Sequence, residues 1–127
     1  MSQMRITGIV RKNLGRGKKL GFPTVNIDLE DSSSPDGIYI ALTRLNGEAF
    51  KSLAFIGAPE MFGETKKKLE VYLLDFNRDI YGQEISVQLL EKIRGNQKFS
   101  SESELIAQMK IDEKQASEFF KTYGRIE

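Results

Sequence analysis

The sequence predicts a mainly β protein: a small closed antiparallel barrel over about 4–99, then a helical segment over about 101–123, in one domain spanning 1–127. Two observations carry this prediction. Short runs of β-branched and apolar residues alternate with turn signals, of which Asn46-Gly47 is the strongest because this pair favours a two-residue hairpin. After Ser101 the apolar residues change to helical spacing. Closing the strands into a barrel leaves no exposed sheet edge.

Five or six strands are expected. The first run is rich in β-branched residues, and the last alternates apolar residues on one face. Between the strands, residues 30–36 form an acidic, serine-rich loop, which is either a plain connection or a lid, and residues 58–68 read as a second loop. The expected strands in chain order are 4–11, an extended segment around 23–26, 37–45, 48–56, 69–76 and 80–93.

The C-terminal segment has the start signal of a helix. Ser101 with Glu104 three residues later forms a capping-box pattern, and Asp112 with Gln115 repeats that pattern less strongly. An aromatic stripe at helical spacing is expected to pack on the barrel rather than to hold a cofactor. It consists of Ala116, Phe119, Phe120 and Tyr123.

Composition limits the chemistry. The 19 Lys and Arg residues nearly balance the 18 Asp and Glu residues, for a net charge of +1, which argues against a generally basic nucleic-acid-binding surface. With no Cys and no His, acid–base chemistry falls to Asp, Glu, Lys or Tyr. No apolar run approaches the roughly 20 residues that span a bilayer, and no signal-peptide core is present. We expect a cytoplasmic monomer without nucleic-acid or membrane partners.

The stretch that ends at Pro23-Thr24-Val25-Asn26 carries the first candidate site. Pro23 keeps the segment extended, so the side chains of Thr24 and Asn26 point the same way. Their neutral oxygens suit Mg²⁺ when nucleotide phosphates supply most of the negative charge. Glycine amides and basic side chains just upstream suit phosphate oxygens, although the spacing is not that of a Walker A loop. These upstream residues are Gly15, Arg16, Gly17, Lys18 and Lys19. The alternative is a polar turn before an ordinary strand.

Glu70 is the candidate general base. It lies within the apolar strand expected at 69–76, where a charge is costly unless it has a task or a partner. The alternative is a strand carboxylate that faces solvent. Asp28 is a further candidate near the metal, because it continues the face of Thr24 and Asn26.

The stretch 90–99 offers two more candidates. Arg94 presents a planar donor fork for an anion or a ring carbonyl, and Phe99 presents a face for stacking. The alternatives are a surface ion pair for Arg94 and a helix-flanking core position for Phe99.

These three stretches resemble the riboflavin kinase family in order and spacing, over about residues 5–120. The resemblance implies a six-stranded Greek-key barrel. It also implies a Mg²⁺-dependent kinase that transfers the γ-phosphate of ATP to the 5′-hydroxyl of riboflavin, giving FMN and ADP. It implies that Thr24 and Asn26 bind the metal and that Glu70 is the catalytic base. It also implies nucleotide contacts at Gly15, Gly17, Lys18, Thr24, Leu73, Asp75 and Tyr81, and flavin contacts at Arg94, Gln97 and Phe99.

The chain departs from the family pattern at three places. Val25 stands where the family carries Ala, residues 55–62 differ from the usual Asn-Ile-Gly and Pro-Thr-Phe motifs, and Asn96 replaces a common Glu. Many bacterial relatives also carry an adenylyltransferase domain with a histidine motif. Since this chain has neither the length nor a histidine, the conversion of FMN to FAD is not expected.

Two other functions compete with the kinase. The first is a non-catalytic flavin- or nucleotide-binding module on the same barrel, against which Thr24, Asn26 and Glu70 speak, because a pure binder needs no base. The second, less favoured, is a small nucleic-acid-binding barrel, which would interleave surface aromatics with a basic stripe.

Overall fold

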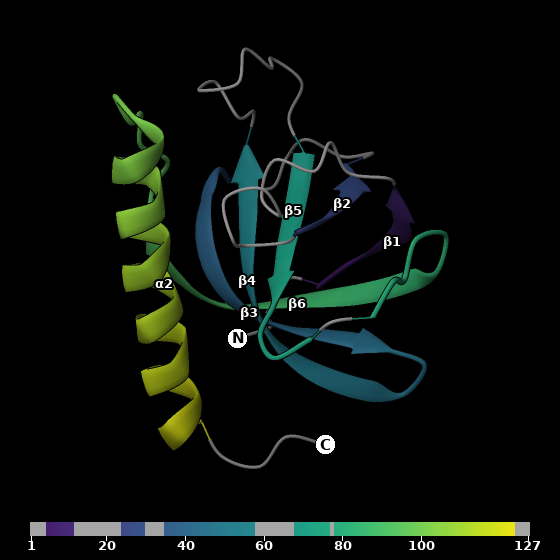
Figure 1. The fold of residues 1–127 in the computed structure, drawn as a ribbon. Coiled ribbons are helices and arrows are strands. Elements are labelled where there is room, and N and C mark those ends of the chain that lie inside the picture. Colours follow the sequence, from purple (N-terminus) through teal and green to yellow (C-terminus); the bar gives the residue numbers. More distant parts are fainter. Residues whose placement is uncertain (1–4, 12–23, 30–34, 58–67, 77, 124–127) are drawn as a thin grey trace.

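The computed structural model describes residues 5–11, 24–29, 35–57, 68–76 and 78–123. In these residues six strands close into an antiparallel barrel in the order β1-β2-β5-β4-β3-β6, and one helix lies against its side (Figure 1). The predicted fold class is therefore confirmed. The elements are β1 (Arg5–Arg11), β2 (Val25–Asp28), β3 (Gly37–Leu45), β4 (Glu48–Gly57), β5 (Lys68–Leu73), β6 (Glu84–Arg94) and α2 (Glu102–Thr122).

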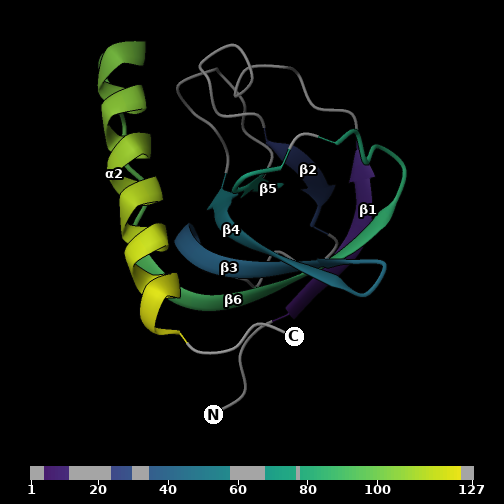
Figure 2. The same cartoon turned by 60° about the horizontal axis from the view of Figure 1, so that its bottom comes forward.

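The strand order makes a Greek key. Strands β3, β4 and β5 form a meander of neighbours, and β6 returns to pair with β3 on the far side. Strands β1 and β2 then close the gap between β6 and β5 (Figure 2). This strand order brings the predicted site stretch that ends at Asn26, part of β2, next to β5.

Two apolar clusters hold the barrel and the helix together. Side chains that alternate along each strand fill the interior, and the opposite faces of β3 and β4 meet α2. The predicted packing of the aromatic stripe on the barrel is confirmed, since Ala116 and Phe120 are buried there and Phe119 and Tyr123 pack beside them. The buried members of the outer cluster are Ile38, Ile40, Leu42, Leu53, Ala116 and Phe120.

The local turn and cap predictions are confirmed. Asn46 and Gly47 both have positive φ, 49° and 85°, as a type I′ hairpin turn requires. The Ser101 hydroxyl accepts a hydrogen bond from the Glu104 amide at 3.2 Å and caps α2. The weaker second cap at Asp112 is wrong, because the helix runs through this residue without a break.

Two strand ends also differ from the prediction. β5 stops at Leu73 rather than at residue 76, and Asp75 follows with a positive φ of 54°. β6 begins at Glu84 rather than at residue 80, because a turn at 80–83 precedes it, with Gly82 at φ 85°. Ile80 still packs into the barrel core, so its apolar character reflects burial and not strand pairing. In the part of the chain described here, no helix is long and apolar enough to cross a membrane.

Candidate functional site

The register between β2 and β5 brings two of the predicted site segments together. Asn26 lies directly opposite Glu70, and Phe55 of β4 flanks Glu70 on its other side. The Thr24 hydroxyl donates to a Glu70 carboxylate oxygen at 3.4 Å, across 46 residues of sequence. These side chains lie on the outer face of the barrel, since the alternate residues Ile27, Leu69 and Val71 fill its core.

The two side chains predicted to offer neutral oxygen ligands are both withdrawn from solvent. Thr24 is 6% exposed and Asn26 is 9% exposed. Within the described residues, the buried Asn26 Oδ1 accepts no hydrogen bond. A buried acceptor without a donor costs about 1–3 kcal/mol, so this oxygen suits a ligand that supplies positive charge. An amide oxygen beside a hydroxyl and a carboxylate fits the ligand preferences of Mg²⁺.

Two neighbours of these oxygens along β2 have other contacts. Val25 points to the opposite side of β2 and packs against the barrel core, so a valine in place of the family's alanine leaves the outer face unchanged. Asp28 is exposed and forms an ion pair with Arg11, at 3.3 Å from its Nε.

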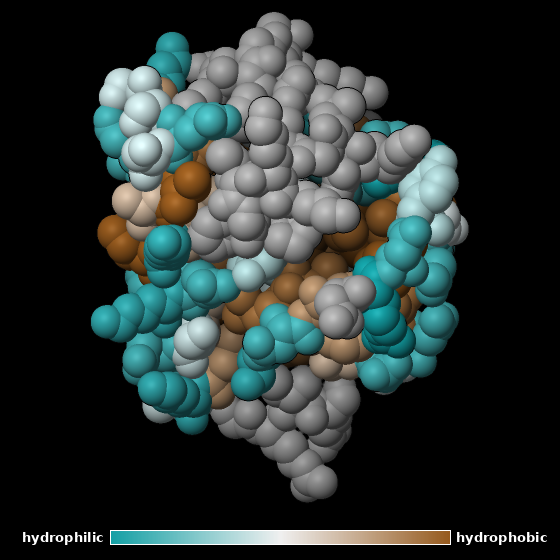
Figure 3. All heavy atoms as spheres, in the orientation of Figure 1, coloured by the Kyte–Doolittle hydropathy of each residue, from teal (hydrophilic) through white to brown (hydrophobic). Residues whose placement is uncertain are grey.

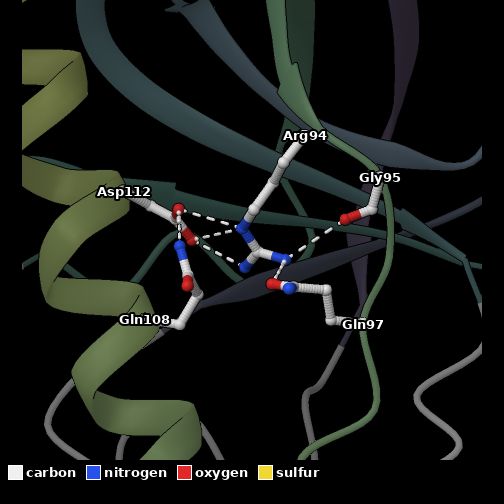
Figure 4. Close-up of polar contacts among 5 residues, drawn as sticks. All are labelled: Arg94, Gly95, Gln97, Gln108 and Asp112. Atoms are coloured by element: carbon white, nitrogen blue, oxygen red, sulfur yellow. Dashed lines mark hydrogen bonds and ion pairs between the residues drawn. The ribbon is translucent and has the colours of Figure 1, made fainter.

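The third predicted segment lies where β6 ends. The Arg94 guanidinium donates through Nε and Nη2 to both carboxylate oxygens of Asp112 on α2, with a shortest distance of 2.7 Å (Figure 4). Its Nη1 donates to the Gly95 carbonyl and to Gln97 Oε1, each at 3.2 Å. The Arg94 side chain is 16% exposed and that of Asp112 is 0% exposed, so the ion pair is buried rather than at the surface.

The other predicted flavin residues surround this ion pair. Gln97 lies against Arg94 in Figure 4, and the Phe99 ring is half-buried, with its centroid 5.9 Å from Arg94 Cζ. Such a distance permits a cation–π contact. The three predicted flavin residues thus form one cluster at the end of β6.

The predicted nucleotide residues are distributed differently. The Leu73 side chain lies in the barrel core at 5% exposure, so only its backbone is available to a ligand on the outer surface. Asp75 is exposed at the turn after β5, and Tyr81 is 62% exposed at the turn before β6. Outside the described residues lie Gly15, Gly17, Lys18, most of the acidic loop and most of the departure at 55–62.

Two residues of α2 that sequence reasoning missed bind strand side chains. Asp112 holds Arg94, and Glu113 accepts a hydrogen bond from the Tyr72 hydroxyl at 2.7 Å. Burial, followed by the nearby Glu113 carboxylate, raises the pKa of Tyr72 to about 12. The available signal for Asp112 was its spacing: it continues the buried helical stripe of Met109 and Ala116, where a carboxylate needs a partner.

A groove of about 560 Å³ is lined by residues of α2, of β4 and of β5 with the turn that follows it. Tyr72 lines it, two residues along β5 from Glu70 and on the same face. Figure 3 shows mainly hydrophilic groups along much of α2 in this view, and three lysines of the helix line the groove, Lys110, Lys114 and Lys121.

A carboxylate beside two neutral oxygens is a combination that phosphoryl transfer can use, with the carboxylate as a base and the oxygens near a metal ion. The comparison with known proteins agrees: the chain belongs to the riboflavin kinase family, whose Flavokinase model matches residues 1–120.

Individual relatives support this assignment. The chain is 35% identical to the bifunctional riboflavin kinase/FMN adenylyltransferase of Bacillus subtilis, over 91% of this chain and 38% of that protein. It is 39% identical to the RNA-binding riboflavin kinase RibR of the same species, over 84% and 47%. The chain thus spans less than half the length of both relatives. The riboflavin kinase structure from Trypanosoma brucei shares the fold, with a TM-score of 0.65 at 22% identity, over 96% of this chain and 82% of that chain.

Proposed function

We propose that this chain is a Mg²⁺-dependent riboflavin kinase, which transfers the γ-phosphate of ATP to the 5′-hydroxyl of riboflavin and releases FMN and ADP. The observation that carries the proposal is the meeting of Thr24, Asn26 and Glu70 on the outer face of β2 and β5. Family membership supports the same reaction.

In this proposal Glu70 accepts the proton of the riboflavin 5′-hydroxyl as that oxygen attacks the γ-phosphorus. A bond forms between the 5′-oxygen and the γ-phosphorus, and the bond from the γ-phosphorus to the bridging oxygen breaks, so that oxygen leaves with ADP. The Thr24 hydroxyl, 3.4 Å from the Glu70 carboxylate, orients it. Asn26 Oδ1 and the Thr24 oxygen would hold Mg²⁺, which when bound neutralises charge on the phosphates.

The two substrates would approach this centre from different sides. For the nucleotide we propose Gly15, Gly17, Lys18, the backbone at Leu73, and the exposed Asp75 and Tyr81. For the flavin we propose the cluster at the end of β6, Arg94, Gln97 and Phe99. Phe99 offers a ring face for stacking, and Gln97 offers an amide.

We propose that residues 1–127 act as one kinase domain, in the cytoplasm and as a monomer, on small molecules and without a nucleic-acid partner. The net charge of +1 supports the last point. A test is gel-shift titration with duplex and single-stranded RNA, in which binding at physiological salt would contradict it.

The reaction is tested by measuring FMN formation from riboflavin, ATP and Mg²⁺ with wild-type protein and with Glu70→Gln. A loss of at least about a hundredfold in the rate is expected, the lower end for removal of a general base. Glu84→Gln is the matched control, because Glu84 is an exposed strand carboxylate on β6, and this variant should keep the wild-type rate.

Two other outcomes are informative. A rate that survives Glu70→Gln keeps the enzyme but moves the base elsewhere, with Asp28 and Asp75 tested next. Wild-type protein that binds riboflavin but makes no FMN with any nucleotide would establish the binding module instead.

A further inference from the structure

The segment that joins β6 to α2 is hydrogen-bonded to two different elements. On one side Arg94 binds Asp112 of α2, and on the other side the Asn96 amide donates to the Ile56 carbonyl of β4 at 3.1 Å. The two residues that make these contacts, Arg94 and Asn96, lie within three residues of sequence, directly before Gln97 and Phe99.

The contacts around Arg94 and Asp112 use most of the hydrogen-bond donors of Arg94. Two nitrogens bind the Asp112 carboxylate, and the third binds the Gly95 carbonyl and Gln97 Oε1 (Figure 4). A carboxylate with no exposed surface depends on such bonds, and Gln108 supplies another at 3.0 Å. Because the fork is planar and bidentate, it fixes the orientation of Gln97 as well as the position of Arg94.

The hydrogen bond to the Ile56 carbonyl depends on the amide of Asn96 and on Gly57. Gly57 has a φ of 151°, and a Cβ added there would lie 2.4 Å from Asn96 Nδ2, so the end of β4 makes room for this side chain. A glutamate is the residue common in the family at this position. Its ionised carboxylate only accepts hydrogen bonds, so it could not donate to the Ile56 carbonyl. The Asn96 amide therefore makes a contact that an ionised glutamate at this position could not make.

We infer that Asp112 and Asn96 are positioning residues for the flavin end of the site. Asp112 holds the segment 94–97 against α2 through Arg94, and Asn96 holds it against the end of β4. Together they hold Gln97 and Phe99 in place before the flavin ring binds. This preorganisation lowers the conformational entropy that is lost on binding. Arg94 serves mainly as the link between the helix and this segment. The inference rests on the proposed function.

The test compares three variants by riboflavin binding, followed through quenching of flavin fluorescence, and by steady-state kinetics. Asp112→Asn removes the charge that holds Arg94, and Asn96→Asp removes the donor to Ile56. Glu113→Gln is the matched control: it is the next residue of α2, and it weakens a bond to Tyr72 on β5 without touching the segment. Circular dichroism and thermal melting establish that each variant folds.

For Asp112→Asn and Asn96→Asp, the riboflavin Kd and KM should rise at least about tenfold, as expected when a charge-assisted or partly buried hydrogen bond is lost. The KM for ATP should stay within about twofold, because the nucleotide end is untouched, and Glu113→Gln should change neither constant. If Asp112→Asn does not fold, the exposed position 96 decides the matter alone.

Folded variants that bind riboflavin like the wild type would overturn the inference. An equal rise of both KM values, or the same rise in Glu113→Gln, would also overturn it, since the effect would then be general loosening of α2. Failure of the proposed function is a separate result, because it would appear in the wild-type protein as no FMN formation, before any substitution is made.

Discussion

The inner and outer faces of β5 serve different purposes within six residues. Leu69, Val71 and Leu73 point inward and are at most 5% exposed, whereas Glu70 and Tyr72 point outward toward Thr24 and α2. Strand pleating separates these two sets completely. The comparison teaches that an inner substitution should change stability and leave the chemistry intact, while a substitution on the outer face around Glu70 should do the reverse.

The largest effect on this comparison is expected from Leu69→Ala. This side chain is fully buried, and such a truncation costs about 2–5 kcal/mol of the free energy of unfolding. That is a large part of the about 5–15 kcal/mol that stabilises a typical domain. Urea unfolding measures the loss, and the rate per folded molecule should stay at the wild-type value. Leu69→Met, which conserves volume, should cost less than about 1.5 kcal/mol. A folded Leu69→Ala protein with a greatly reduced rate would break the comparison.

On the outer face, Asn26→Leu should act mainly on metal use. Loss of the Oδ1 ligand should raise the Mg²⁺ concentration for half-maximal rate at least about tenfold. Stability should not fall, because that buried oxygen accepts no hydrogen bond from the described residues. Val25→Ala is the matched control: the neighbouring side chain points to the core, so its Mg²⁺ titration should be unchanged. An unchanged titration for Asn26→Leu would remove Asn26 from the proposed metal site.

The smallest effect is expected from Tyr72→Phe, which removes the hydrogen bond to Glu113 and should cost about 1 kcal/mol. Its pH dependence is more specific. The pKa of Tyr72 is raised from 10.0 to about 12 in the folded protein, so the folded state holds its proton more tightly than the unfolded state. The resulting stabilisation is complete below pH 10 and is lost as the pH rises toward 12.

Thermal melts between these pH values, compared for wild type and Tyr72→Phe, measure that loss. The wild type should lose more stability than the variant over this range, since the other tyrosines are common to both. Parallel losses would show that the Tyr72 hydroxyl does not carry the alkaline sensitivity.

The sequence by itself determined the features that depend on neighbouring residues. The Asn46-Gly47 turn, the Ser101 cap and the alternation along β6 follow from local conformational preferences and periodicity, so their prediction was correct. The three candidate motifs were also visible in the sequence, but their roles in binding and catalysis stay predictions.

The tertiary structure decided what depends on contacts between distant residues. Only the register of β2 against β5 places Glu70 opposite Asn26, and only the packing of α2 gives Asp112 its partner Arg94. Asp112 was misread as a cap because its capping signal is local, whereas burial against β6 is not. The apolar run beyond Leu73 likewise predicted a longer strand, since apolar residues alone do not distinguish pairing from burial. Local signals specify elements, and long-range packing specifies which side chains meet.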